Sequence, residues 1–106
     1  MSSPKKIMIM VTRIVRMHFA EKGVKVFKEL FKKHRVAMAS VDGCVSLELY
    51  SEANQPTSFA TISKWKSEEH LEAYRKSALF SAIWTKIKPH FSEKAEAFSL
   101  VDLDDQ

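Results

Sequence analysis

The sequence is poor in cysteine, glycine and proline, with one Cys, two Gly and three Pro in 106 residues. The lone cysteine, Cys44, has no partner for an intramolecular disulfide, which excludes a disulfide-stabilised secreted scaffold. So little glycine and proline also excludes a collagen-like chain or a linker, and it predicts regular structure over most of the length. The four histidines and Cys44 do not follow the close spacing of zinc ligands, so we predict no metal site.

Long apolar runs are also missing. The longest one near the N-terminus, Ile7–Val11, has five residues and ends at Thr12 and Arg13. The core of an export signal needs about 7–15 apolar residues and a membrane-spanning helix about 20. We therefore expect neither an export signal nor a membrane segment, and we expect the protein to be cytoplasmic.

What the sequence does contain is enough apolar material for one core. Hydrophobic residues make up 45% and aromatic residues 10% of the chain, which predicts a folded protein rather than a disordered one. At this length we expect a single domain over residues 1–106, with an ordered core at about 7–103 and short tails.

The charge is mildly basic, with 17 Lys and Arg against 13 Asp and Glu, a net charge of +4. Several of the basic residues fall within 25–35, where Glu29 lies among them and Glu21 just before. Such mixing is typical of a solvated helix face, and a nucleic-acid site would need a basic stripe beside stacking aromatics. We expect no nucleic-acid partner.

Hydrophobic periodicity predicts the order of the elements. Strands are expected at 7–19, 44–50, 58–65 and 95–103, helices at 24–40 and from Ser67 with a break near Ser77 and a second segment at 79–88, and a hairpin connection at 51–57. This order predicts an α+β, ferredoxin-like βαββαβ fold, an antiparallel four-stranded sheet with the helices on one face.

The predicted strands are apolar on both sides, although the helices cover only one face of such a sheet. A bare apolar face of this size needs a partner, and the simplest one is a second copy related by a two-fold axis. We therefore expect a homodimer.

A set of short motifs in the second half of the chain appears in a known order. A Trp ends a strand, a Ser-x-Glu opens a helix, and a Ser-x-x-Phe follows; these residues are Trp65, Ser67, Glu69, Ser77 and Phe80. The set resembles the antibiotic biosynthesis monooxygenase family of the dimeric α/β barrel superfamily. The turn Asp42-Gly43-Cys44 resembles the glycine turn that leads into the second strand of that family.

The resemblance implies a homodimer whose two sheets pack face to face, with a pocket between sheet and helices in each subunit. Members include cofactor-free monooxygenases of phenols and quinols, and enzymes that degrade haem with an Asn on the first strand, a Trp and a His. Aligned on the Ser-x-x-Phe motif, the Trp and His positions hold Tyr74 and Trp84, and the only Asn is Asn54, in the hairpin. The resemblance therefore implies no haem chemistry, and we expect no cofactor.

Five residues are candidates for the site. His34 interrupts an apolar helical stripe and is a candidate general base, since the ordinary pKa of histidine lies near neutrality; the alternative is a boundary histidine bonded to backbone. Tyr74 is a candidate proton donor or hydrogen-bond partner. Trp65, Trp84 and Phe80 are candidate walls of a substrate pocket, although aromatics at helical spacing also serve as core.

Two functions remain open at this point. The first is a cofactor-independent monooxygenase that acts with dioxygen on a small aromatic molecule of quinol or phenol type, in which Arg16 or Arg75 offsets the charge of the substrate anion. The second is a non-catalytic dimeric module of the same fold that binds a small ligand or is associated with the stress response. RNA binding by the same strand and helix order is disfavoured, because the central strands lack the required pattern of exposed aromatics.

Overall fold

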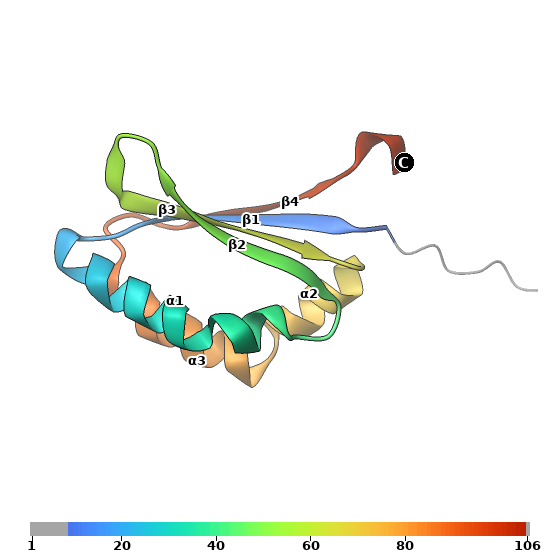
Figure 1. The fold of residues 1–106 in the computed structure, drawn as a ribbon, viewed down its shortest axis with the longest axis horizontal. Coiled ribbons are helices and arrows are strands. Elements are labelled where there is room, and N and C mark those ends of the chain that lie inside the picture. The colour runs from blue at the N-terminus through green and yellow to red at the C-terminus, as the bar shows by residue number, and fades with distance from the viewer. Residues whose placement is uncertain (1–8, 106) are drawn as a thin grey trace, which may run out of the picture.

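The computed structural model describes residues 9–105, and within them a four-stranded antiparallel sheet carries all three α-helices on one side (Figure 1). The elements are β1 (Val11–His18), α1 (Val24–Ala39), β2 (Cys44–Glu52), β3 (Gln55–Trp65), α2 (Glu68–Arg75), α3 (Ala78–Ile87) and β4 (Glu96–Val101), with single 3-10 turns at Glu21–Gly23, Lys88–His90 and Leu103–Asp105. The sheet order is β2-β3-β1-β4. The predicted ferredoxin-like fold is therefore confirmed.

The first helix matches its predicted range to within a residue, and the second helical region divides at Ser77 as expected. Ser67 caps α2 by accepting a hydrogen bond from the backbone N–H of His70 (3.2 Å). Ser77 caps α3 in the same way through Phe80 N–H (3.1 Å), and its own hydroxyl donates to the carbonyl of Tyr74 (2.6 Å). Each serine thus satisfies backbone groups that a helix end leaves unpaired.

The hairpin between β2 and β3 is shorter than predicted. The strands continue to Glu52 and resume at Gln55, so the turn has two residues instead of the expected connection at 51–57. Asn54 has a φ of 65°, a left-handed conformation that asparagine tolerates better than most residues. Pro56 lies in the strand, beyond the point where β1 pairs with β3, so its missing N–H interrupts no ladder on that side.

The first and last strands are shorter than predicted. β1 begins at Val11, and the predicted strand residues Ile7 and Met8 lie outside the described residues. β4 ends at Val101, before the 3-10 turn that begins at Leu103.

The alternation of side chains along the strands separates two faces of the sheet. Val15 lies beside Thr61 across the pairing of β1 with β3, and both face the helices; Ile14 lies beside Ile62, and both face away. The face away from the helices is here called the open face.

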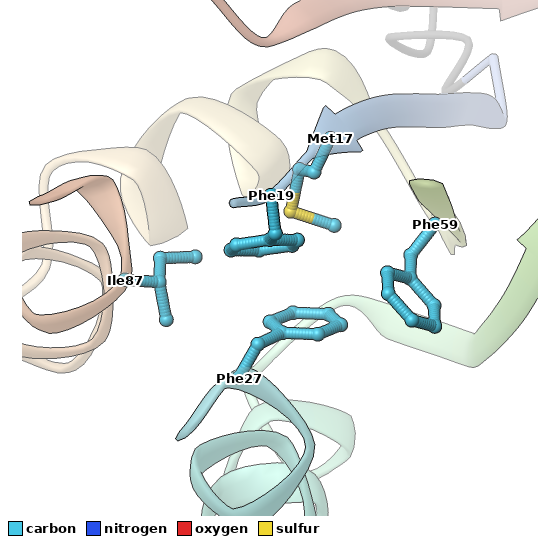
Figure 2. Packing of buried hydrophobic residues seen from close by; sticks show 5 residues of the cluster. All are labelled: Met17, Phe19, Phe27, Phe59 and Ile87. Atoms are coloured by element: carbon cyan, nitrogen blue, oxygen red, sulfur yellow. The ribbon is translucent and has the colours of Figure 1, made fainter. Parts of the chain in front are cut away.

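The core consists of two buried clusters at opposite ends of the helix-covered face. One contains Met17, Phe19, Phe27, Phe59 and Ile87. In this cluster the rings of Phe19 and Phe27 stack with centroids 4.4 Å apart, and Met17 and Ile87 close the sides (Figure 2). The other contains Val11, Trp65 and Leu71. Between the two clusters, a cavity separates the middle of the sheet from the helices.

Candidate functional site

A cavity of about 80 Å³ lies between the helices and the middle of the sheet. Residues from β1, α1, β2, β3, α2 and α3 line it: Val15, Met17, Phe27, Leu30, Phe31, Met38, Cys44, Leu47, Thr61, Ser63, Trp65, Tyr74, Phe80, Ile83, Trp84 and Ile87. An apolar cavity of roughly 150 Å³ accommodates benzene. The space in this protein therefore admits a small apolar group or part of one aromatic ring.

Four aromatic candidates from the sequence line this cavity and form a continuous row. The Trp65 and Tyr74 rings stack at 5.1 Å, Tyr74 meets Phe80 edge to face at 5.3 Å, and Phe80 stacks on Trp84 at 5.7 Å. The row joins the end of β3 to α2 and α3, and it exists because the break at Ser77 lets two short helices present aromatics to one space. It gives the cavity a rigid wall.

Tyr74 carries the polar atom best suited to a ligand. Burial raises the pKa of its phenol to about 12, with a smaller contribution from nearby Cys44, so the hydroxyl stays protonated at neutral pH. Within residues 9–105 the phenol makes no hydrogen bond, although the ring is held on both sides by Trp65 and Phe80. A fixed ring with a free O–H is a hydrogen-bond donor available to a ligand.

The remaining polar groups of the lining are few. Ser63 Oγ accepts a hydrogen bond from the Trp65 indole N–H (2.9 Å), which fixes the plane of that ring. The Cys44 thiol donates to the carbonyl of Ser46 (3.6 Å), and burial raises the pKa of the thiol. Cys44 is thus held in its neutral, weakly reactive form.

His34 is absent from the cavity lining. It lies on the same face of α1 as Leu30, Phe31 and Met38, which do line the cavity. The side chain is partly buried, and its Nε2 atom is buried without a hydrogen-bond partner among the described residues. A buried, unpaired imidazole nitrogen costs free energy in the absence of a partner.

The two arginines considered for offsetting a substrate anion lie on different faces. Arg16 is on the open face, where Nε and Nη2 donate to the two carboxylate oxygens of Glu52 (2.9 and 2.7 Å). This pairing raises the pKa of Arg16 and lowers that of Glu52. Arg75 ends α2 beside the cavity residue Tyr74. Arg16 is therefore on the wrong side of the sheet to reach a ligand in the cavity.

Arg13 is a residue that sequence reasoning missed. It faces the helices one step along β1 from Val15, and in the strand register it lies directly opposite Ser63, so both of these neighbours are cavity residues. The sequence feature that could have identified Arg13 is its position in the alternating series with Val11, Val15 and Met17. That signal becomes useful only when the helix-facing side of β1 is known.

Among the described residues, no three His, Cys, Asp or Glu side chains cluster closely enough to hold a metal ion. Nor does any described helix combine the length and apolar character needed to cross a membrane.

Fold and cavity together define a ferredoxin-like α+β domain with an apolar site between sheet and helices. The family model of antibiotic biosynthesis monooxygenases matches residues 10–86, and the chain therefore belongs to the antibiotic biosynthesis monooxygenase family. A comparison with curated protein sequences finds no match.

Solved structures support the fold at low sequence identity. A conserved protein from Methanosarcina mazei has a TM-score of 0.83 at 19% identity, with 88% of this chain and 92% of that chain covered. A protein from Mycobacterium tuberculosis has a TM-score of 0.82 at 19% identity, with 90% and 96% covered. A variant of SnoaB, a cofactor-independent oxygenase from Streptomyces nogalater, has a TM-score of 0.77 at 17% identity, with 89% and 93% covered.

Proposed function

We propose that the protein is a cofactor-independent monooxygenase that oxidises a small aromatic hydroxyl compound with dioxygen. The observation that carries the proposal is the free, protonated Tyr74 hydroxyl held by an aromatic row at an apolar cavity. Membership of the family and the similarity to a structure described as a cofactor-independent oxygenase support it.

The proposed chemistry asks little of the protein. Removal of the hydroxyl proton makes the ring electron-rich enough to pass an electron to dioxygen, and the two radicals combine to form a carbon–oxygen bond. The peroxide then loses water as the proton on that carbon leaves, which produces a quinone. The ring has lost two hydrogens and gained one oxygen atom, and the second oxygen atom leaves as water.

Tyr74 and His34 have different parts in this scheme. The Tyr74 hydroxyl donates a hydrogen bond to the developing anion and then to the peroxide, in surroundings from which water is largely excluded. His34 is the proposed proton acceptor, because its Nε2 atom is unpaired and the residue shares the cavity-facing side of α1, although it lies outside the lining. Trp65, Trp84 and Phe80 form the wall against which the ring lies.

The test is dioxygen uptake with a panel of hydroquinones and single-ring phenols. We expect one dioxygen consumed per quinone formed, and we expect His34→Ala to lower turnover about a hundred-fold or more while its melting temperature changes little.

Tyr50→Phe is the matched control for Tyr74→Phe, because Tyr50 is the only other tyrosine and lies on the open face. Tyr74→Phe should abolish uptake and Tyr50→Phe should preserve it. If the parent protein consumes no dioxygen with any compound of the panel, and His34→Ala melts much lower, the catalytic assignment is wrong and His34 is a structural histidine.

The proposal includes a homodimer formed through the open face. Ile14 lies between Ile62 and Phe98 in the strand register, so one apolar row crosses three strands of this face. Phe98 and Leu100 remain 46% and 48% exposed in the single chain. A second copy packed on this row would remove them from water.

A further inference from the structure

A group of charged residues lies beside the cavity residues Ser63 and Tyr74 and has no part in the proposed oxidation. It consists of Arg13 on β1 and of Arg75 and Glu72 on α2. Leu71, one helical turn before Arg75, belongs to the same buried cluster as Val11, and Arg13 follows Val11 on the same face of β1. The helix and the strand thus bring the two arginines to the same margin of the cavity.

Within residues 9–105, Glu72 acts on both guanidiniums. Arg75 Nη1 donates to Glu72 Oε1 (2.7 Å), which neutralises one charge. Among the described residues, Arg13 donates from Nη1 to the neutral hydroxyl of Ser99 (3.1 Å). Burial lowers the pKa of Arg13, the positive charge of Arg75 lowers it further, and Glu72 raises it. Arg13, Arg75 and Glu72 together therefore carry one excess positive charge, partly withdrawn from water.

Solvent reaches this margin from the side of β4. Every residue of β4 is exposed, including Ser99, whose side chain shares the helix-facing side of the sheet with Arg13. The covering helices leave this edge strand free. A ligand that enters from here would meet the arginines before the apolar wall.

We propose that Arg13 and Arg75 form an anion site at the mouth of the cavity, which holds the carboxylate of a single-ring aromatic acid. A guanidinium binds a carboxylate through two parallel N–H groups, and a shared anion removes the repulsion between two neighbouring cations. The ring then points toward Tyr74, and the cavity, with a volume of about 80 Å³, takes up part of that single ring. This inference rests on the proposed function only in that the same cavity takes the ring.

The test compares two ligands of equal shape, para-hydroxybenzoate and its neutral amide, para-hydroxybenzamide, by isothermal titration calorimetry. The parent protein should bind the acid about ten-fold or more tightly than the amide, as hydrogen bonds to a charged group require. Arg13→Gln and Arg75→Gln should each remove most of this preference while the affinity for the amide stays unchanged. Arg13→Lys should keep part of the preference for the acid, because lysine keeps the positive charge but lacks the two parallel N–H groups of a guanidinium.

Two further variants separate a local charge effect from a change in net charge. Glu72→Gln removes the competing carboxylate and should tighten the binding of the acid alone. Lys94→Gln removes one positive charge from the exposed loop before β4, five residues before Ser99, and should leave the preference intact. Circular dichroism melts check that every variant is folded.

The outcomes also separate this inference from the proposed function. Equal affinity of the parent for acid and amide, no binding of either, or a preference that survives Arg13→Gln overturns the anion site, whatever the dioxygen measurements give. A preference lost in Arg13→Gln supports the site even if no compound is oxidised, and in that case only the oxygenase assignment fails.

Discussion

At the scale of single residues, the two glycines make room for two histidine rings. A Cβ atom on Gly43 would lie 2.3 Å from the His70 ring, and one on Gly23 would lie 2.5 Å from His90 Cβ. Gly43 also has a φ of +84°. His70 in turn bonds Ser67 Oγ through Nδ1 (2.6 Å), so the turn before β2 is locked to the start of α2.

Gly43→Ala should lower the free energy of unfolding by about 1–3 kcal/mol, because the substitution both strains the backbone and collides with His70. Urea denaturation followed by circular dichroism measures the change. The double variant Gly43→Ala/His70→Ala should recover part of the loss, since it removes the collision and leaves the strained φ. A single variant as stable as the parent would contradict the close contact.

The buried Tyr74 phenol should make the fold sensitive to alkali. Its pKa of about 12 in the folded state exceeds the ordinary value near 10, so the folded state holds this proton more tightly than the unfolded state. The associated stability is present below pH about 10 and is lost as the pH rises toward about 12. Tyr74→Phe should therefore lose less stability over this range than the parent, as urea midpoints at each pH would record.

Tyr50→Phe serves as the control in this titration. The pKa of Tyr50 is also raised, by its hydrogen bond to Glu48, but the residue is exposed on the open face. Its replacement should leave most of the alkaline loss in place. An identical pH dependence in the parent and Tyr74→Phe would show that the Tyr74 ring is not withdrawn from water.

The residues that line the cavity could be predicted only where a motif carried them. Trp65, Tyr74, Phe80 and Trp84 were candidates from the sequence, and they meet at one cavity. Arg13 was not a candidate, because its importance depends on which strand side the helices cover and on a residue 62 positions later. The charge of Arg75 acts on Arg13 across the folded structure, and an interaction between residues so far apart in sequence leaves no local pattern.

At the scale of elements, the division between α2 and α3 shapes the site. A single long helix would send its aromatics around the axis, whereas the break lets Tyr74 and Phe80 meet at the cavity. Ser77 takes part in four hydrogen bonds at this break, since its backbone N–H also donates to the Tyr74 carbonyl (2.9 Å) and its carbonyl accepts from the Ser81 N–H (3.1 Å).

Ser77→Ala should lower the free energy of unfolding by about 1 kcal/mol through the lost cap, as for other serine caps. Ser81→Ala on the exposed side of α3 is the control and should be neutral or slightly stabilising, because alanine is the better helix former. Thermal melts of both variants provide the measurement. Equal melting temperatures for the two would mean that the hydroxyl of Ser77 contributes no stability.

The positions of the helices and strands could be predicted from hydrophobic periodicity, but the length of the hairpin turn could not. Asn54 and Pro56 are turn-forming residues, and they favoured a longer connection than the two-residue turn that forms. The pairing of β2 with β3 extends each strand beyond its apolar stretch, because backbone bonds across the hairpin do not depend on side-chain hydrophobicity. Strand ends are therefore the least predictable part of this fold.

At the scale of the whole molecule, the open face is apolar at its centre and charged at one end. Arg16 bridges Glu52 and Glu96 (3.6 Å), and His18 approaches Glu96 (3.5 Å). The pairing satisfies these charges within the sheet, so the charged end leaves few unpaired groups to oppose a second copy.

Light scattering should give a mass near twice 12.2 kDa at micromolar concentration. Phe98→Glu places a charge in the apolar row and should shift the protein to monomers. Val36→Glu is the matched control, since Val36 is 77% exposed on the helical side, and it should leave the dimer intact. A parent protein that scatters as a 12 kDa monomer would contradict the proposed assembly.

The aromatic row also determines how the protein interacts with ultraviolet light. The chain has two tryptophans, Trp65 and Trp84, and both line the same cavity. All of the tryptophan emission therefore originates at the cavity wall, and none comes from a remote residue that would add a constant background. Any molecule that enters is reported by both indoles at once, without a label and without a change to the sequence.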